Sequence, residues 1–491
     1  MIQLTTRSAA SAQQLNVRAV NVAEVGLGIR VDEVRNGTDG EARGVVISSE
    51  EVLLIAGERG QANAAWRSSG ALFARFRQRT TSHVTLDVRE LVIDDSSMVA
   101  FAEGVLLLGT GSQTRLTRAR LEVEPPIELL VSPSTSGLWE AALVKAQRTV
   151  DAVFFARRLT NLPASHLSAE TFARTIEDGA ATTSASVDIV GSAGLREMGC
   201  GGILAVNAGS DQPPRLVRVA HVPPDAGLVI GLVGKGVMYD SGGISLKPTD
   251  ASHVKMKMDM AGAAVAAAVA LYMDTAMENR IGVAAYLPCV ENMPSGSAMR
   301  LGDVVTCRDG TTVEIQNCDA EGRLILADAL ALAREDRVDV LIDLATLTDA
   351  ASIAIGPDFA AMMCSDDDLA ADLLRSATKT GELLCRLPIH RPYERLLRSA
   401  IADVRNVGGP AGRVVTAGLF LERFAHPVPW AHIDMTSTMA SDEDADIHRI
   451  GATGYGVRLV LDLIANMAAR VGPSDRTSFR RSTWPVTAPS E

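Results

Sequence analysis

The chain has 491 residues, 47% of them hydrophobic and 22% charged, which is the composition of a globular protein with a sizeable core. This balance excludes an intrinsically disordered chain, a collagen-like repeat and a small disulfide-rich protein. The formal net charge of −12 argues against broad electrostatic binding to nucleic acid. Six scattered cysteines without a C-x-x-C pair favour a reducing compartment, and we expect a soluble, cytoplasmic protein without a secretory signal or a membrane span.

The first third of the chain has the pattern of a small α/β unit. Short β-branched runs at 44–48, 84–86 and 105–108 alternate with polar, alanine-rich stretches. Residues 1–150 carry 16 basic and 17 acidic side chains, so the remaining residues hold a charge of −11. This asymmetry and the proline- and serine-containing segment 128–137 indicate a domain boundary. We expect an N-terminal α/β domain over 1–135, a connecting helix over 136–160, a larger domain over 161–470 and a disordered tail over 471–491.

The larger domain alternates strand and helix patterns. Apolar runs predict strands at 228–233, 281–289, 313–316, 338–344 and 430–435. Helical patterns are found at 261–273, 323–335 and 452–469. Because the strands are apolar on both faces and are separated by helices, we predict an α/β fold with a mixed sheet covered by helices on both faces.

Several common catalytic signatures are missing from the sequence. There is no H-E-x-x-H pair, and the eight histidines lack metal-ligand spacing, so His432 beside Trp430 is expected to be structural. The segment GLVGKG (231–236) resembles a phosphate-binding loop but does not satisfy G-x-x-x-x-G-K-[ST]. The G-x-S-x-G nucleophile elbow is absent too. A serine hydrolase or a nucleotide-dependent enzyme would therefore lack its usual signature.

Carboxylates and lysines instead gather in the loops that follow predicted strands. In open α/β sheets such loops form the ligand site, and carboxylates that converge there can hold two divalent cations. Only six of the 47 basic residues are lysine, yet four lie between 235 and 257, and a lysine amine can become a metal ligand. Lys255 and Lys257 are expected to face solvent, and for Asp319 alone a helix cap is the simpler alternative. The candidate set is Lys235, Asp240, Lys247, Asp259, Asp319, Glu321 and Arg323.

Longer motifs connect the sequence to a known family. They are VGKGVMYDSGGISLKP (233–248), MDMAGAA (258–264), ENMPSG (291–296), NCDAEGRLILADAL (317–330), DLATLT (343–348) and TAGLFL (416–421). These segments closely resemble the leucine (cytosol) aminopeptidase family, whose members are dinuclear-metal enzymes. The resemblance covers about residues 150–470, and no motif matches before residue 130.

The resemblance implies an aminopeptidase that removes one residue from peptides with a free N-terminus. The implied ligands are Lys235, Asp240, Asp259 and Glu321 at a tighter site, and Asp240, Asp319 and Glu321 with the main-chain carbonyl of Asp319 at a more exchangeable one. Lys247 would polarise the scissile carbonyl, and Arg323 would hold a bicarbonate ion acting as general base. The two divalent ions would be Zn or Mn, with Mg and Co as alternatives. Family members usually form hexamers, which implies a homohexamer.

The pocket for the first substrate side chain departs from the family pattern. By resemblance it is formed by Met256, Thr346, Leu347, Asp349, Thr436 and Met439. Asp349 and Thr436 stand where glycine or another small residue is usual. We therefore expect a narrower, more polar pocket, a weaker preference for leucine and a shift toward small, polar or cationic first residues. The alternative is that Asp349 turns away to cap the next helix and leaves the specificity unchanged.

Two other functions stay open at this point. One is a specialised relative that acts on a single peptide-like metabolite, which the altered pocket suggests. The other is a non-catalytic or DNA-binding role, against which the net charge counts. Arg75, Arg77 and Arg79 form a small basic cluster, but a solvated surface explains it more simply. We expect neither a nucleic-acid nor a membrane partner.

Overall fold

The computed structural model describes residues 2–5, 15–19, 44–47, 51–55, 63–78, 84–87, 94–108, 127–273 and 280–471. The chain divides into two compact units. Unit 1 comprises Met1–Phe154, Thr378–Gly381 and Asp442–Ile450, and unit 2 comprises Phe155–Ala377, Glu382–Ser441 and Gly451–Glu491. Among the helices described, none is both long and apolar enough to cross a membrane. The tail expected after residue 471 lies outside the described residues.

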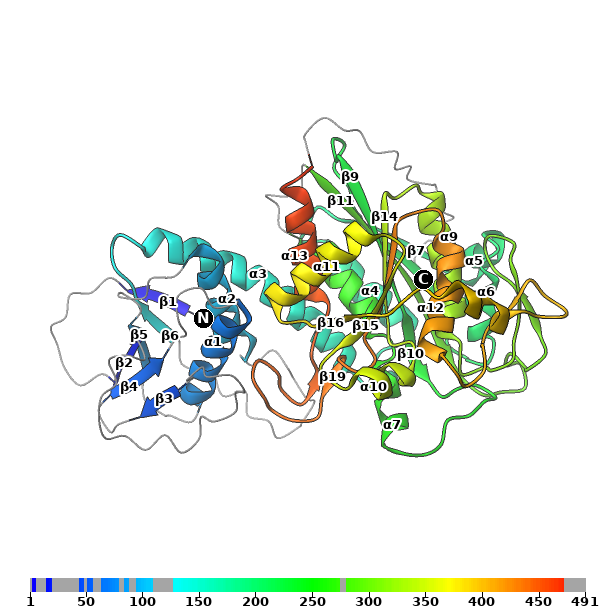
Figure 1. The fold of residues 1–491 in the computed structure, drawn as a ribbon, viewed down its shortest axis with the longest axis horizontal. Coiled ribbons are helices and arrows are strands. Elements are labelled where there is room, and N and C mark those ends of the chain that lie inside the picture. The colour runs from blue at the N-terminus through cyan, green and yellow to red at the C-terminus, as the bar shows by residue number, and fades with distance from the viewer. Residues whose placement is uncertain are drawn as a thin grey trace. The chain divides into compact units, whose positions relative to one another are not determined.

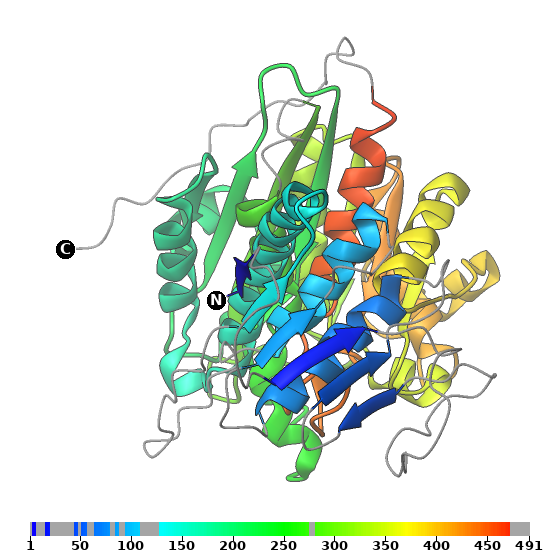
Figure 2. The same cartoon turned by 90° about the vertical axis from the view of Figure 1, so that its left-hand side faces the viewer.

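Unit 1 is built on one sheet with helices beside it (Figure 1, Figure 2). Its strand order is β1-β6-β5-β2-β4-β3, and neighbours run parallel except for the pair β3 and β4. The strands are β1 (Ile2–Thr5), β2 (Leu15–Ala19), β3 (Gly44–Ile47), β4 (Glu51–Ile55), β5 (Val84–Asp87) and β6 (Ile127–Leu130). The helices are α1 (Asn63–Gln78), α2 (Asp95–Leu107) and the first part of α3 (Ser136–Asn161).

The extended run expected at 105–108 is wrong, because these residues end helix α2. Asp94 starts this helix by accepting a hydrogen bond from the backbone N–H of Ser97 at 2.8 Å. Phe101 and Val105 are both buried and lie four residues apart, so they share one helix face. The β-branched Val105 in a short apolar run therefore does not indicate a strand here, because its packing on one face of α2 favours the helical conformation.

Unit 2 contains a nine-stranded mixed sheet. Its order is β16-β15-β18-β14-β9-β11-β8-β7, with β10 also paired to β11. The strands are β7 (Ser186–Val190), β8 (Arg215–His221), β9 (Leu228–Gly234), β10 (Gly236–Asp240), β11 (Ile281–Asn292), β14 (Val340–Ala345), β15 (Ala360–Cys364), β16 (Leu384–Arg386) and β18 (Trp430–Asp434). Smaller sheets are made by β12 (Val304–Thr306), β13 (Thr312–Glu314) and β17 (Val404–Arg405), and by β19 (Ala440–Ser441) and β20 (Gly451–Ala452).

Helices cover both faces of this sheet (Figure 1). One face is covered by α4 (Ala169–Ala180), α8 (Ala261–Tyr272) and α13 (Val457–Ala468), and the other by α6 (Gly201–Asn207), α9 (Gly322–Glu335) and α12 (Arg413–Ala425). The remaining helical segments are η2 (Ala164–His166), α5 (Ser192–Glu197), α7 (Ala251–Val254), η3 (Lys255–Met258), α10 (Asp349–Ile355), α11 (Asp367–Thr380) and η5 (Arg391–Leu397). The predicted fold class, a mixed sheet between two helical layers, is confirmed.

The last helix starts later than its pattern predicts. The expected helix over 452–469 begins at Val457, because Gly451 and Ala452 form β20 and pair with β19. Gly454 and Gly456 then adopt φ values of +69° and +97°, in the left-handed region that a right-handed helix excludes.

The central strands β9, β14 and β18 are parallel and end at the same edge of the sheet. The register places Gly234 beside Leu344, and Ala345 beside Asp434. Helix α8 approaches this edge closely, since a Cβ on Gly262 would lie 2.0 Å from the carbonyl oxygen of Leu344. The glycine of the MDMAGAA motif therefore brings the start of α8, and Asp259 just before it, against the ends of the strands.

Candidate metal centre

Each acidic residue of the candidate set lies at the end of a strand or the start of a helix. Lys235 lies between β9 and β10, Asp240 ends β10, and Asp259 immediately follows η3. Glu321 is the residue before α9, and Asp319 lies two positions earlier. The segments that carry these residues are far apart in the sequence, and the sheet brings them to one edge, as expected for strands of an open α/β fold.

Three carboxylates form the buried inner part of the cluster. Asp240, Asp259 and Glu321 each offer an oxygen, and these oxygens lie within 4.8 Å of one another. The ammonium of Lys235 is 2.8 Å from Asp259 Oδ2 and 2.9 Å from Glu321 Oε1. A Cβ on Gly322 would lie 2.4 Å from Cε of Lys235, so glycine at this position lets the lysine reach the carboxylates.

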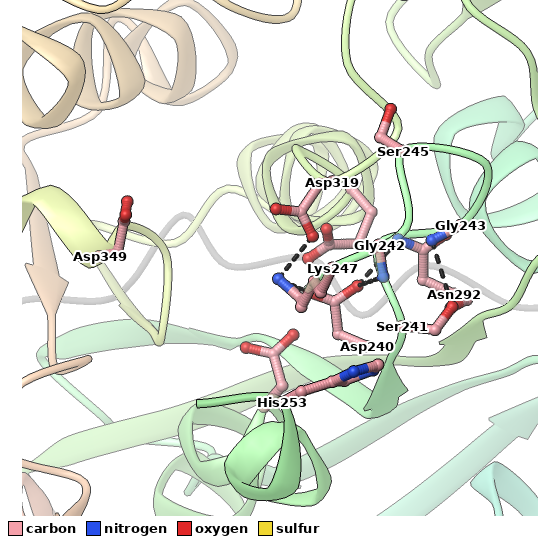
Figure 3. Close-up of polar contacts among 12 residues, drawn as sticks. Asp240, Ser241, Gly242, Gly243, Ser245, Lys247, His253, Asn292, Asp319 and Asp349 are labelled. Carbon is pink, nitrogen blue, oxygen red and sulfur yellow. Dashed lines mark hydrogen bonds and ion pairs between the residues drawn. The ribbon is translucent and has the colours of Figure 1, made fainter. Parts of the chain in front are cut away.

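Lys247 and Asp319 form the outer part of the cluster. The Lys247 ammonium lies 2.8 Å from Asp240 Oδ2 and 2.5 Å from Asp319 Oδ1, and Figure 3 shows it between the two carboxylates. The side chains of Lys247 and Asp319 are 17% and 29% exposed, whereas Asp240 is 4% exposed. A molecule from solvent therefore reaches the cluster on the side of Lys247 and Asp319.

Both lysines are held as ammonium ions by the carboxylates around them. Desolvation on burial lowers the pKa of Lys235, but the charges of Asp259, Glu321 and Asp240 outweigh it, so the net pKa is above its ordinary value. For Lys247 burial again lowers the pKa, and Asp240 and Glu321 again reverse the shift. The two ammonium ions are thus counter-ions of the carboxylates.

The carboxylates respond to burial and to their neighbours in different ways. Burial raises the pKa of Asp259 well above its ordinary value, although the Lys235 ammonium lowers it in part. For Glu321 burial also raises the pKa, but Lys235 and Lys247 outweigh it and the net pKa is lowered. Glu321 is therefore the most firmly ionised carboxylate of the three in the inner cluster.

The residues fit divalent cations. Carboxylate oxygens are the ligands that hard cations prefer, and a buried group of three is costly unless positive charge accompanies it. In addition, Glu321 Oε2 is buried and has no hydrogen-bond partner within the described part of the chain. A cation bound between these side chains would satisfy that oxygen and replace the ammonium groups as counter-charge.

Arg323 lies in the first turn of α9, next to the cluster. It is 6% exposed, and its Nη1 donates a hydrogen bond of 2.6 Å to the carbonyl oxygen of Asn406. Its Nε is buried and has no hydrogen-bond partner among the described residues. Burial lowers the pKa of Arg323 to about 10, which still leaves it cationic at neutral pH. The Nε–H of Arg323 is therefore able to donate a hydrogen bond to a small anion or to a water molecule.

The hydroxyl groups of the two threonines expected in the substrate pocket both donate hydrogen bonds to buried aspartates. Thr346 donates to Asp259 Oδ1 at 2.6 Å, and Thr436 donates to Asp434 Oδ1 at 2.6 Å. Met439 is buried. Of the remaining three residues of the expected pocket, Met256 and Leu347 are half-buried and Asp349 is exposed.

Asp349 does not point toward the cluster. Figure 3 shows its carboxylate apart from Lys247 and the acids, at the start of α10. It is 64% exposed and lies 2.9 Å from Nη2 of Arg413. The neighbouring Thr348, rather than Asp349, caps α10 by accepting a hydrogen bond from the N–H of Ala351. The Asp349 side chain thus points away from the cluster. It pairs with Arg413 and does not cap α10 as the alternative expected, because Thr348 supplies that cap.

Two lysines expected to face solvent do not do so. Lys255 and Lys257 are half-buried in η3, and Lys257 donates a hydrogen bond of 2.9 Å to the carbonyl oxygen of Asn161. For Lys257 the expectation was wrong because its long side chain reaches this carbonyl oxygen instead of extending into solvent. His432 is buried as expected of a structural residue, with Nδ1 2.6 Å from Asp343 Oδ1 and its ring stacked on Trp430.

Two polar residues that sequence reasoning missed organise the site. Asp434 is fully buried and accepts hydrogen bonds from Leu347 N–H and from the hydroxyls of Thr348 and Thr436. Asn292 is also buried and donates to Asp240. Both end a strand of the sheet, so a polar residue closing an otherwise apolar run is the signal that would have identified them.

Cation binding is expected to weaken as the pH falls below 6. Burial raises the pKa of Asp319 to about 6, and the charges of Asp240 and Glu321 add to the shift. A carboxylate must lose its proton to bind a cation, so below this pKa the affinity should fall by about tenfold per pH unit. Calorimetric Mn²⁺ titrations at several pH values test this. Asp319→Asn should weaken binding and remove the step near pH 6, whereas a wild-type affinity independent of pH would contradict the prediction.

The sheet and the cluster together define an α/β protein with a buried group of carboxylates and lysines, a candidate metal centre, at the carboxyl edge of its strands. Residues 154–461 match the catalytic domain of the cytosol aminopeptidase family, and the chain belongs to this family.

Several proteins with this description are similar to the chain. A probable cytosol aminopeptidase of Cyanothece sp. is 40% identical over 66% of this chain and 66% of its own length. One from Chlorobaculum tepidum is 44% identical over 63% of this chain and 61% of its own length. One from Caulobacter vibrioides is 39% identical over 81% of each chain. The chain thus spans slightly less than two thirds of the first two relatives.

Two solved structures are also similar. The bottromycin maturation enzyme BotP superposes with a TM-score of 0.79 at 33% sequence identity, covering 93% of this chain and 100% of that chain. The same enzyme in complex with Mn gives a TM-score of 0.79 at 34% identity. The similarity to these structures therefore extends over most of the chain.

Proposed function

We propose that this protein is a metal-dependent aminopeptidase that removes the N-terminal residue of peptides. The observation that carries the proposal is the meeting of Asp240, Asp259 and Glu321, with oxygens within 4.8 Å of one another, in a chain of the cytosol aminopeptidase family. A solved structure of the similar enzyme BotP is in complex with Mn, which supports a divalent metal in this chain. Leucine-type specificity, Zn or Mn as the native ions, cytoplasmic location and a homohexamer belong to the same proposal.

Five residues would hold two divalent cations: Lys235, Asp240, Asp259, Asp319 and Glu321. When bound, the cations would supply Lewis acidity and lower the pKa of a water molecule. For Lys235 to act as a ligand it must give up its proton. A cation held by Asp259 and Glu321 would offset the negative charges that raise the pKa of this lysine.

Lys247 and Arg323 would act on the substrate and on the proton. The Lys247 ammonium is on the solvent-accessible side of the cluster, where a peptide carbonyl can reach it, and it would stabilise negative charge on that oxygen. Arg323 is buried, its Nε has no hydrogen-bond partner in the described part of the chain, and it would hold a bicarbonate ion as general base. The free amino group of the peptide would bind at the metal centre. Only the first residue has such a group, which would limit cleavage to that residue.

Metal removal and restoration test the proposal. Leucine, methionine, alanine and arginine anilides are offered to metal-stripped protein and then to the same protein with Mn²⁺ or Zn²⁺ restored. We expect hydrolysis only after metal is restored and its loss again in Asp319→Ala. Equal hydrolysis by stripped and restored protein would contradict a metal-dependent mechanism.

Asp349 is expected to have little influence on the choice of first residue. Its carboxylate is exposed and paired with Arg413. Because an exposed ion pair is worth about 1 kcal/mol or less, Asp349→Asn should change the ratio of kcat/KM for leucine and arginine anilides by less than about fivefold. Arg413→Ala, which releases the carboxylate, should favour the arginine anilide. A tenfold gain in leucine preference in Asp349→Asn would instead support a pocket narrowed by this residue.

A second candidate function is the processing of one peptide-like metabolite. It is favoured by the similarity to BotP, which is described as a bottromycin maturation enzyme and aligns over 93% of this chain. If the metal-loaded protein cleaves none of the four anilides, modified peptides become the substrates to test. DNA binding has less support, since Arg75 donates hydrogen bonds to the carbonyl oxygens of Asp446 and His448. The side chains of Arg77 and Arg79 lie outside the described residues.

A further inference from the structure

Asn292 bonds to one candidate metal ligand and to the residue that precedes another. It ends β11, where the register places it beside Asp240, and it is 2% exposed. Its Nδ2 donates one hydrogen bond of 2.9 Å to Asp240 Oδ1 and another of 3.0 Å to the carbonyl oxygen of Cys318. Cys318 directly precedes Asp319, so one amide group connects the end of β10 with the segment before α9.

The hydrogen bonds of Asp240 leave one of its oxygens for a cation. Oδ1 accepts from Asn292 Nδ2 and from the backbone N–H of Gly242, both at 2.9 Å. A carboxylate oxygen has two lone pairs in its plane, so these two donors occupy Oδ1. Oδ2, which lies 2.8 Å from the Lys247 ammonium, is the oxygen that faces the cluster.

The surrounding turn keeps Asn292 in place. The N–H and hydroxyl of Ser241 both donate to the carbonyl oxygen of Asn292, at 3.1 and 2.6 Å. Gly243 has a φ of +60°, and a Cβ there would lie 2.6 Å from Asn292 Oδ1. A side chain at position 243 would therefore displace the amide, which accounts for the second glycine of the DSGG segment.

We propose that Asn292 is a positioning residue for the metal centre. It directs Oδ2 of Asp240 into the cluster and fixes the loop that carries Asp319, without itself binding metal or substrate. The inference rests on the proposed metal-dependent function. Residues that hold a metal ligand by hydrogen bonds typically contribute about 10–100-fold to metal affinity.

The test compares metal binding by the full-length protein with Asn292 changed to Asp or to Ala. Asn292→Asp keeps the shape but replaces the donor with an acceptor beside the Asp240 carboxylate. Asn466→Asp is the matched control, because the Nδ2 of half-buried Asn466 also donates to a carboxylate, that of Asp462, within helix α13. Mn²⁺ affinity is measured by calorimetry, the visible spectrum is recorded with Co²⁺, and circular dichroism checks folding.

We expect both Asn292 variants to bind Mn²⁺ about 10–100-fold more weakly and to show an altered Co²⁺ spectrum. Asn466→Asp should keep the wild-type affinity and spectrum even if it unfolds at a lower temperature. Wild-type affinity and spectrum in a folded Asn292→Asp protein would overturn the positioning role and leave the proposed function intact. Failure of the wild-type protein to bind any Mn²⁺ would overturn the proposed function and, with it, this inference.

Discussion

Glu321→Gln is expected to abolish hydrolysis of aminoacyl anilides and to strip the protein of its cations. Glu321 is 1% exposed, belongs to the inner cluster and has one oxygen paired with Lys235 and the other without a hydrogen-bond partner in the described residues. Removing one member of a buried charge set costs about 3–5 kcal/mol, so metal affinity should fall by about 10²–10⁴-fold. The metal content after dialysis and the rate at saturating Mn²⁺ together measure this effect.

The control for Glu321→Gln is Asp225→Asn, which also removes one negative charge but at an exposed position of the same unit. It should retain both metal content and activity. If Glu321→Gln kept two cations and an unchanged rate, the cluster of Asp240, Asp259 and Glu321 would not be the metal centre.

Lys247→Met is expected to lower kcat by about 10²–10³-fold while two cations stay bound, since this is the usual cost of removing one group that stabilises a developing oxyanion. The physical reason is that Lys247 has two roles that the substitution separates. Without metal its ammonium neutralises Asp240 and Asp319. With metal bound, that neutralisation is no longer needed, and the ammonium is available to the substrate carbonyl.

Lys257→Met provides a matched control for Lys247→Met, because Lys257 lies on the neighbouring η3 and bonds to the carbonyl oxygen of Asn161 rather than to an acid of the cluster. It should retain kcat. Loss of the cations in Lys247→Met would show that this lysine supports metal binding instead of catalysis, and an unchanged kcat would exclude it from the reaction.

The proposed metal binding would also account for a lysine at position 235 in a chain whose basic residues are almost all arginine. Only six of the 47 basic residues are lysine. Arginine in place of Lys235 would stay charged at any accessible pH and would repel a cation next to Asp259 and Glu321, whereas an amine can lose its proton. The rarity of lysine in the sequence and the ion pairs of Lys235 with Asp259 and Glu321 thus both favour a role for Lys235 at the site.

The amino-acid sequence by itself determined the fold class and singled out the candidate metal ligands. The long apolar runs predicted the strands of the main sheet, and the motifs around 240, 259 and 321 singled out the acids that the structure brings together. The separation of Asp319 and Glu321 by one residue before a helix is likewise a local feature. Such features are readable because hydrophobic periodicity and the position of a residue at the end of a strand depend only on nearby sequence.

Only the tertiary structure decided how these side chains are held and which way their neighbours point. Asn292 lies 52 positions from Asp240, and the hydrogen bond between them exists because β10 and β11 are paired. Asp349 turns to Arg413, 64 positions away, which no local pattern reveals. The burial of Lys257 and the helical state of 105–108 also follow from packing. Long-range hydrogen bonds and packing depend on the register of distant segments, and a single sequence does not encode that register in any short window.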